Sequence, residues 1–182
     1  MVLAAGSSTR FSAGSKQLAL LDGRPLVAIA VQAALDAACF DTVVVVTGAV
    51  GLDAVLPEGV EVCHNPAWSS GQASSLQTGI EAARRRGAAA VVVGLADQPR
   101  VSAEDWRSVA MVDTERPAVV ATYGGVPGNP VRLAAAIWSE LPREGDEGAR
   151  ALLRGRPDLV TAVACRGDAT DVDTVEDLDR WN

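Results

Sequence analysis

The feature that most constrains the fold of this chain is its alternation of apolar, β-branched runs with alanine-rich helical stretches. Residues 42–47 read TVVVVT, and residues 89–95 form a second apolar run. A strand with no polar face must be covered on both sides, as happens in parallel sheets whose strands are joined by helices. The pattern therefore predicts an α/β fold with three layers, α/β/α, built around a mostly parallel, Rossmann-like sheet.

The other segments extend this alternation along the whole chain. The expected strands are 2–5, 42–47, 60–64, 89–95, 118–122 and 159–163, and the expected helices are 26–38, 73–86, 103–112, 133–141, 148–153 and one that begins at Thr174. With 182 residues, 48% of them hydrophobic, the chain is long enough for one well-buried domain and short for two. We therefore expect a single domain over residues 1–182.

Charge and cysteine usage limit the partners and the compartment. The formal net charge is −7, whereas a protein that binds the nucleic-acid backbone needs a basic surface. The three cysteines form no C-x-x-C pair, which favours reduced thiols. No basic segment followed by an apolar one opens the chain, and the apolar run at 88–96 is too short to cross a bilayer. We expect a soluble, cytoplasmic protein without nucleic-acid or membrane partners.

The loop after the first expected strand has the composition of a phosphate-binding site. Residues 3–18 read LAAGSSTRFSAGSKQL. Small residues let backbone N–H groups approach phosphate oxygens, and Arg10 and Lys16 supply positive charge. Lys16 is followed by Gln17 rather than Ser or Thr, and no G-x-G-x-x-G occurs, so neither the ATPase P-loop nor the dinucleotide fingerprint fits.

Two segments that carry carboxylates complement this loop. Residues 97–99 (DQP) follow the strand expected at 89–95, and residues 171–173 (DVD) precede the last expected helix. Ligands of open α/β sheets gather at the carboxyl ends of the strands. His64 is the one histidine, so the chain has no H-E-x-x-H site, and it has no G-x-S-x-G elbow for a serine nucleophile. The residues therefore favour phosphate chemistry assisted by carboxylates.

These segments, in this order, resemble the MobA-like nucleotidyltransferases, and among them the molybdenum cofactor cytidylyltransferases most closely. The matching motifs are LAAGSSTRF at 3–11, KQL at 16–18, LDGRPL at 21–26, NPAW at 65–68, SSL at 74–76 with Gly79, LADQP at 95–99, GNPV at 128–131, GDEGAR at 145–150 and DVDT at 171–174. The resemblance implies a nucleotide-diphospho-sugar-transferase-like fold. It also implies an enzyme that transfers a nucleoside monophosphate from a triphosphate to a phosphorylated acceptor and releases pyrophosphate.

The same resemblance implies the residues of the nucleotide site. Backbone groups of the loop would wrap the triphosphate, Arg10 would hold the β- and γ-phosphates, and Lys16 would lie near the α-phosphate. The nucleotide-binding residues implied are Leu3, Ala4, Ala5, Gly6, Ser7, Ser8, Arg10, Lys16, Ser74 and Ser75. The catalytic residues implied are Arg10, Lys16 and Asp97.

Magnesium is the implied cofactor, since carboxylate and phosphate oxygens form its usual shell. Asp97 and Asp173 would hold the ion, with Asp171 as a further candidate. Two of these residues also have structural explanations. Asp97 suits a turn before Pro99, and Asp173 lies where a side chain can cap the next helix.

The donor base and the acceptor are implied less directly. In the family, the sequence of residues 4–6 (AAG) goes with pyrimidine donors, which favours CTP, and Ser75 resembles a residue that contacts the base. Ser74 and Ser75 also suit the first turn of a helix, where hydroxyl groups satisfy free N–H groups. The expected acceptor is of the molybdopterin type, with the product passing to a molybdenum hydroxylase.

Asn129 leaves the acceptor open, because the cytidylyltransferase subgroup commonly has histidine at this position and asparagine cannot carry a proton at neutral pH. Arg150 is a candidate contact for the acceptor's phosphate, while Asp146 also suits a helix cap. Three alternatives follow. The chain could be a guanylyltransferase, a cytidylyltransferase with another phosphorylated acceptor, or a chaperone that binds a nucleotide or a pterin without turnover.

Overall fold

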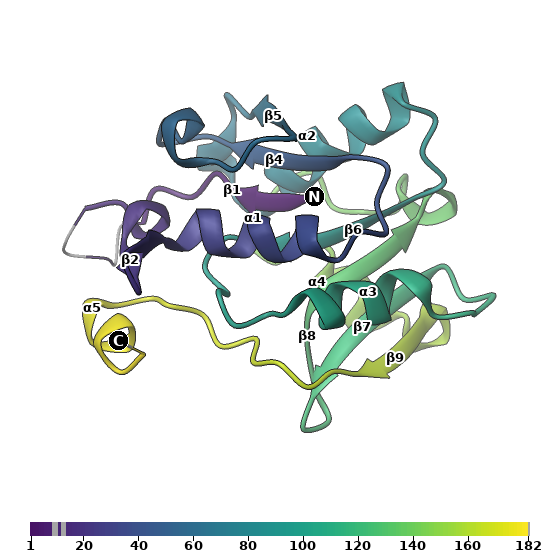
Figure 1. Cartoon of the computed structure of the whole chain (residues 1–182). Helices are drawn as coiled ribbons and strands as arrows, with labels where there is room; N and C mark the ends of the chain where they lie inside the picture. Colours follow the sequence, from purple (N-terminus) through teal and green to yellow (C-terminus); the bar gives the residue numbers. More distant parts are fainter. Residues whose placement is uncertain (9–10, 12–13, 182) are drawn as a thin grey trace.

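The computed structural model describes residues 1–8, 11 and 14–181 (Figure 1). The strands are β1 (Val2–Ala4), β2 (Leu20–Leu21), β3 (Arg24–Pro25), β4 (Val43–Thr47), β5 (Val60–His64), β6 (Ala90–Leu95), β7 (Ala118–Tyr123), β8 (Val126–Ala134) and β9 (Val160–Ala164). The helices are α1 (Leu26–Asp36), α2 (Gln72–Arg85), α3 (Ala103–Met111), α4 (Arg150–Gly155) and α5 (Val175–Asp179). No helix in this described part of the chain is both long and apolar enough to cross a membrane.

One seven-stranded sheet forms the centre of the molecule, in the order β5-β4-β1-β6-β8-β7-β9. The pairs β1–β4, β1–β6, β4–β5 and β7–β9 are parallel, and β8 is antiparallel to both of its neighbours. The prediction of a mostly parallel sheet is therefore confirmed. The strands β2 and β3 form a separate small hairpin.

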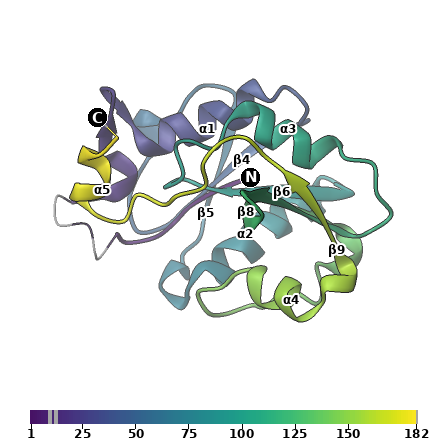
Figure 2. The same ribbon diagram turned by 90° about the horizontal axis from the view of Figure 1, so that it is seen from below.

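Helices cover both faces of the sheet (Figure 2). The helices α1 and α3 lie on one face, and α2 and α4 lie on the other. The first face holds an apolar core that includes Val31 of α1 and Trp106 of α3, and the second holds a core that includes Ile80 of α2 and Leu153 of α4. Because strands such as β4 are buried along their whole length between these cores, the three-layer α/β/α arrangement follows from their uniformly apolar sequence.

The central strand β1 sets the position of the site. It pairs in parallel with β4 and β6, so the three strands end at the same edge of the sheet. The segments that leave this edge begin at Ala5, Gly48 and Ala96. They bring the glycine- and serine-rich loop and the 97–99 segment together.

The helix expected at residues 133–141 is wrong, because no α-helix forms there. Residues 126–134 form β8, and the chain then makes a short 3₁₀ helix at Ala135–Ile137. Prolines at 127 and 130 argue against an inner strand, because proline cannot donate to the sheet. An irregularity opposite Val120 and Ala121 accounts for Pro130, since it leaves Asn129 and Pro130 out of the pairing with β7. Pro127 lies where β8 pairs with β7 alone, and a strand with one neighbour tolerates proline.

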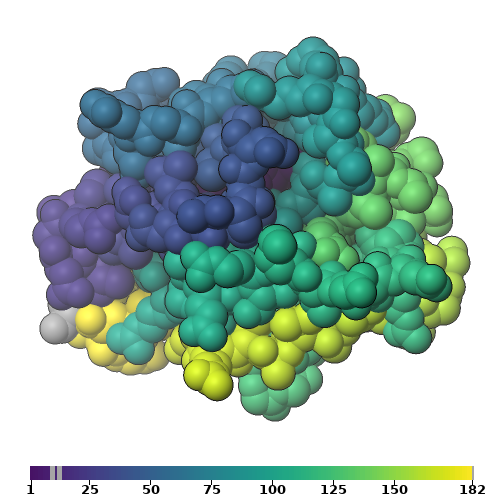
Figure 3. All heavy atoms as spheres, turned by 45° about the vertical axis from the view of Figure 1, so that its right-hand side comes forward, coloured from purple at the N-terminus to yellow at the C-terminus, as the bar shows by residue number. Residues whose placement is uncertain are grey.

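The end of the chain returns to its beginning. After β9, at the edge of the sheet, residues 165–174 run without helix or strand to α5. The space-filling view shows this segment alongside α3 and reaching the N-terminal part of the chain (Figure 3). Val172 and Leu178 pack there with Phe11, Leu21 and Leu26 in a small third core. This packing brings the 171–173 segment to the edge of the sheet where β1 ends.

Candidate active site

A cleft of about 530 Å³ opens at this edge of the sheet. Its walls come from the end of β1 and the following loop, the start of α2, and the segments after β6 and β9. The lining residues are Leu3, Ala4, Ala5, Gly6, Ser7, Ser8, Phe11, Lys16, Gln17, Trp68, Ser69, Gly71, Gln72, Ser75, Leu95, Ala96, Asp97, Asp146 and Asp173. Most of the residues expected to bind the nucleotide therefore face one space. Arg10, expected to hold two of the phosphates, lies outside the described residues.

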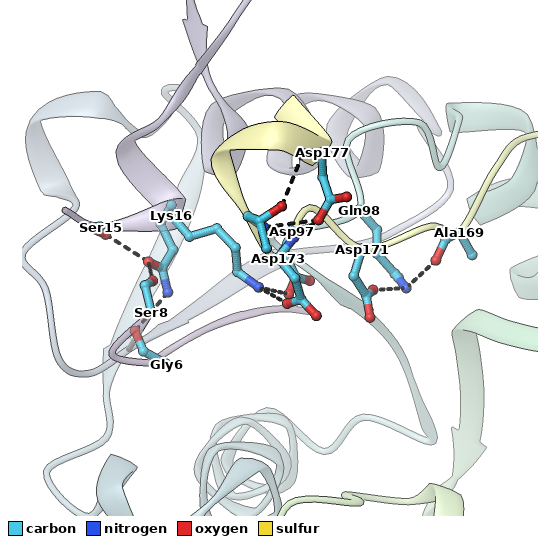
Figure 4. A network of polar contacts seen from close by, with 12 residues as sticks. Gly6, Ser8, Ser15, Lys16, Asp97, Gln98, Ala169, Asp171, Asp173 and Asp177 are labelled. Atoms are coloured by element: carbon cyan, nitrogen blue, oxygen red, sulfur yellow. Dashed lines mark hydrogen bonds and ion pairs between the residues drawn. The ribbon is translucent and has the colours of Figure 1, made fainter. Parts of the chain in front are cut away.

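The ammonium group of Lys16 lies between two carboxylates in this cleft (Figure 4). Its Nζ is 2.7 Å from Oδ2 of Asp97 and 3.0 Å from Oδ1 of Asp173. Burial by itself lowers the pKa of Lys16, but Asp97 and, less strongly, Asp173 raise it, and the net shift is upward. The ammonium therefore stays charged and joins three segments that are far apart in the sequence.

Gln17, the next residue, holds the loop in shape. Its Nε2 donates to the carbonyl oxygen of Gly6 at 2.8 Å, and its Oε1 accepts from the hydroxyl groups of Ser8 and Ser15, each at 2.7 Å. The side chain is buried, so these hydrogen bonds form out of competition with bulk water. A single amide thus joins the beginning and the end of the loop, while Gly6 and Ser7 remain exposed to the cleft.

The residues that follow β4 pack against the beginning of this loop. The amide of Ala49 donates to the carbonyl oxygen of Ala5 at 3.1 Å. A Cβ atom at Gly48 would lie 2.7 Å from that same oxygen and 2.6 Å from Cβ of Trp68, a separation at which atoms collide. A residue without a side chain is therefore required where these two segments meet.

Ser74 and Ser75 have different surroundings at the start of α2. Asn65 is buried and donates from Nδ2 to both hydroxyl oxygens, at 2.9 Å and 3.0 Å. The hydroxyl of Ser74 also contacts the carbonyl oxygens of Ala67 and Gly71 and does not line the cleft. Ser75 does line it. The geometry therefore makes Ser75 available to a ligand and gives Ser74 a role in the local structure.

The carboxylates of Asp97 and Asp173 suit a hard divalent cation. Oδ1 of Asp97 is buried and has no hydrogen-bond partner within the described residues, and an unpaired carboxylate oxygen in such a place is costly unless a cation or a water satisfies it. Across residues 1–8, 11 and 14–181, no group of three or more His, Cys, Asp or Glu side chains is arranged to hold a metal ion. Two carboxylates with phosphate oxygens and water match the shell that magnesium or manganese adopts beside a nucleotide.

Asp171, the further candidate for the metal, is engaged elsewhere. Its Oδ1 accepts a hydrogen bond from Nε2 of Gln98 at 2.8 Å, and the residue does not line the cleft. Partial burial of the carboxyl raises the pKa of Asp171, as does the negative charge of Asp97, although the residue as a whole keeps contact with solvent.

The alternative explanation for Asp173, a helix cap, is not what the geometry shows. Thr174 caps α5, and Asp177 completes the capping box. Asp177 also accepts a hydrogen bond from the backbone amide of Asp173 at 3.2 Å, which helps hold Asp173 at the cleft.

The cleft residues without a predicted role in the nucleotide site include Trp68, Gln72 and Asp146. Asp146 comes from a distant part of the chain. The amide of Ala73 donates to the carbonyl oxygen of Gly145 at 2.9 Å, which docks the GDEGAR segment against the start of α2. Asp146 is not the cap of α4, whose N-cap is Ala149. The motif match at 145–150 is the signal in the sequence that marks this segment.

A second cavity, of about 450 Å³, adjoins the cleft, because Leu3 and Gln72 line both. It lies against the face of the sheet that carries α2 and α4, with mainly apolar walls from β6, β7, β8 and β9. Its polar residues include Asn129, Arg150 and Arg154. The two residues that the motifs connect with the acceptor, Asn129 and Arg150, thus share one cavity.

Two known proteins have sequences similar to that of this chain. The chain is 33% identical, over 99% of its length and 94% of the relative's, to nicotine blue oxidoreductase of Paenarthrobacter nicotinovorans. It is 29% identical to the purine catabolism protein PucB of Bacillus subtilis, over 66% of this chain and 59% of that protein.

Solved structures share the fold. Rv0371c of Mycobacterium tuberculosis superposes with a TM-score of 0.84 at 27% identity, over 98% of this chain and 94% of that one. A second structure of Rv0371c, in complex with manganese, gives a TM-score of 0.81 at 28% identity, over 99% and 95% of the two chains. At 22% identity, the nucleotidyl transferase Mth528 of Methanothermobacter has the same fold, with a TM-score of 0.83 over 98% and 93% of the two chains.

The sequence profile of one family covers most of the chain. It is the profile of the MobA-like NTP transferase domain, and it matches residues 1–162. The matched part contains the glycine- and serine-rich loop, Lys16, Ser75 and Asp97, whereas Asp173 follows it. The chain belongs to the MobA-like NTP transferase family.

Proposed function

We propose that this protein transfers CMP from CTP to a phosphorylated acceptor of the molybdopterin type, with magnesium as its cofactor, and releases pyrophosphate. The observation that carries the proposal is the position of Lys16 between Asp97 and Asp173, at the edge of a cleft lined by the glycine- and serine-rich loop. An ammonium group and two carboxylates lie together there, beside exposed backbone suited to phosphates.

In the proposed reaction, a phosphate oxygen of the acceptor attacks the α-phosphorus of CTP. The bond from that phosphorus to the bridging oxygen of the β-phosphate breaks, and pyrophosphate leaves with the electron pair. Transfer of this kind depends mainly on positioning and charge neutralisation. The loop from Ala5 to Ser8 would bind the phosphates, and Lys16 would neutralise the charge that develops on them.

Asp97 and Asp173 are the residues that would hold a divalent ion. Such an ion would supply further positive charge to the phosphates and fix their orientation. The manganese in the related Rv0371c structure supports a divalent metal in this family, and the buried, unpartnered Oδ1 of Asp97 supports its place in this chain.

CTP is the proposed donor on two grounds. Residues 4–6 (AAG) and Ser75 have the identities that go with pyrimidine donors in related enzymes, and both segments line the cleft. Asn65 donates to the hydroxyl oxygen of Ser75 at 3.0 Å, which orients this hydroxyl in the wall of the cleft.

The second cavity is the proposed place for the body of the acceptor. It adjoins the cleft, which an attacking phosphate requires, and its mainly apolar walls suit a ring system. Arg150 at its edge supplies a charge for the acceptor's phosphate. A molybdenum hydroxylase is the proposed recipient of the product.

A second candidate function comes from the relative named nicotine blue oxidoreductase, which is 33% identical to this chain. A reaction of that class would use the second, mainly apolar cavity for an organic substrate. It would also need an electron donor, and the chain lacks the G-x-G-x-x-G fingerprint of dinucleotide binding.

Product analysis tests the two candidates side by side. The protein is incubated with magnesium, molybdopterin and CTP that carries a radioactive α-phosphate, and separately with nicotine blue and NADH or NADPH. We expect the label in a CMP–acceptor product, with pyrophosphate released in equal amount. Oxidation of NADH or NADPH without any label transfer contradicts the proposal and supports the oxidoreductase. Binding of molybdopterin without either reaction supports the chaperone alternative.

A further inference from the structure

Asp173 reaches the cleft through a segment that has no regular structure of its own. Residues 165–174 leave β9, the edge strand, and cross the ends of β7 and β8 before they reach β6. Figures 1 and 3 show this stretch in yellow beside the green α3 segment. We call residues 165–173 the crossing segment. Its position cannot come from pairing within the sheet, so other contacts must hold it.

The crossing segment is tied to residues 97–105 by hydrogen bonds along its length. Near its start, Oδ1 of Asp105 accepts from the backbone amides of Arg166 and Gly167, at 3.0 Å and 3.3 Å. Near its end, the backbone amide of Val172 donates to the carbonyl oxygen of Asp97 at 2.9 Å. The residue that follows Val172 is Asp173, so this last bond lies directly beside the two carboxylates.

Between these ties, the side chain of Gln98 holds the middle of the crossing segment (Figure 4). Its Nε2 donates to the carbonyl oxygen of Ala169 and to Oδ1 of Asp171, both at 2.8 Å. Gln98 is only 4% exposed, and its Oε1 has no partner among the described atoms. Both partners of Nε2 are acceptors, so only an amide with its NH₂ group turned to the crossing segment satisfies them.

We propose that Gln98 is a positioning residue that sets where Asp173 lies relative to Asp97. Gln98 follows Asp97 directly in the chain, and it donates a hydrogen bond to Asp171, two residues before Asp173. One side chain therefore links the two segments that supply the carboxylates. The inference rests on the proposed function, because it assigns Gln98 to the divalent-metal site of that reaction.

Manganese binding tests this role apart from turnover. Gln98→Met keeps the length of the side chain and removes both donors. We expect the affinity for Mn²⁺ in the presence of CTP, measured by electron paramagnetic resonance, to fall by about tenfold, as for other residues that orient metal ligands.

Gln77→Met is the matched control. The Nε2 of Gln77 also donates to two carbonyl oxygens, those of Leu141 and Pro142, at 3.2 Å and 3.0 Å, and it lies outside the cleft. We expect this variant to lower the midpoint of thermal unfolding about as much as Gln98→Met while it leaves the affinity for Mn²⁺ unchanged. Equal affinity in Gln98→Met and the wild type, or an equal loss in both variants, would overturn the proposal.

Two further variants, Gln98→Glu alone and combined with Asp171→Asn, keep the proposal testable if Gln98→Met folds poorly. In Gln98→Glu, a carboxylate replaces the NH₂ donor and faces two other acceptors, the carbonyl oxygen of Ala169 and the carboxylate of Asp171. We expect this variant to bind Mn²⁺ more weakly than Gln98→Met. Adding Asp171→Asn restores a donor opposite residue 98 and removes a negative charge. The double variant should therefore bind Mn²⁺ at least about threefold more tightly than Gln98→Glu does. No recovery contradicts the proposal, as does loss of Mn²⁺ binding by Asp171→Asn alone, which would make Asp171 itself a ligand.

The outcomes separate this inference from the proposed function. A wild type that binds Mn²⁺ with CTP but forms no product contradicts the proposed function, and the comparison of variants still decides the role of Gln98. A wild type that binds no Mn²⁺ in the presence of CTP overturns both.

Discussion

Lys16 is the residue on which the chemistry of the cleft depends most. Its ammonium lies within 3.0 Å of both Asp97 and Asp173, and the net shift of its pKa is upward. In the absence of a ligand it forms ion pairs with both carboxylates. In the proposed reaction it would offset the negative charge of the phosphates.

Replacement of Lys16 by methionine tests how its charge affects turnover and metal binding. Lys16→Met keeps the aliphatic chain and removes the charge, so we expect pyrophosphate release to fall by roughly 10²-fold or more. The affinity for Mn²⁺ should be retained or rise, because a competing cation is gone from between the carboxylates. Steady-state kinetics and electron paramagnetic resonance measure the two effects. Activity within threefold of the wild type would contradict the role of Lys16.

Gln17 provides a second prediction at this scale. Gln17→Met leaves the carbonyl oxygen of Gly6 and the hydroxyl groups of Ser8 and Ser15 without their partner. Loss of such buried hydrogen bonds costs about 1–3 kcal/mol of the free energy of unfolding, measured by urea denaturation. The KM for CTP should rise as the loop loosens. An unchanged KM would mean that the amide does not set the shape of the loop.

At the scale of the elements, the strands and helices with the most uniform composition were predicted best. The apolar runs gave β4 and β6 to within one residue of the expected limits, and periodic alanine-rich stretches gave α1, α2 and α3 nearly as well. The strand β8 was missed because its prolines and glycine are typical of turns. An irregular pairing accommodates Pro130, and Pro127 lies where β8 has a strand on one side only; neither feature has a signature in a single sequence.

The packing of α3 on the sheet yields a prediction about β6. Gly94 lies against the ring of Trp106, and a Cβ atom at position 94 would approach Cη2 to 2.6 Å. Trp106 is almost completely buried, so the ring has little room to move. We expect Gly94→Ala to lower the free energy of unfolding by about 1–3 kcal/mol. Gly51→Ala, where a Cβ would meet open space, is the control, and equal stability of the two variants would contradict the packing argument.

At the scale of the whole molecule, the site joins the two ends of the chain. The loop at 3–18 and Asp97 were predicted as parts of one site, since both follow parallel strands. The hydrogen bonds of Gln17 and Gln98 were not predicted, because contacts between segments that lie far apart in the sequence leave no local pattern. The motifs therefore predicted Lys16, Asp97 and Asp173, whereas only the fold showed how Gln17 and Gln98 hold the segments that carry them.

This assembly predicts that a nucleotide stabilises the folded protein as a whole. A ligand that binds only the folded state raises its stability by about 2.7 kcal/mol at a hundred times its Kd. We expect CTP with magnesium to raise the midpoint of thermal unfolding more than GTP, UTP or ATP does. A larger shift with GTP would favour the guanylyltransferase alternative, and no shift with any of the four would contradict nucleotide binding in the cleft.

In the proposed function, Asp97 and Asp173 hold the divalent ion of a nucleotidyl transfer. The most direct test is the rate of pyrophosphate release from CTP in the presence of magnesium and molybdopterin, compared between the wild type, Asp97→Asn and Asp173→Asn. We predict release by the wild type that stops when magnesium is removed, and a loss of roughly 10²-fold or more in each variant. Normal pyrophosphate release by Asp97→Asn would contradict the assignment of Asp97 as a ligand of the divalent ion.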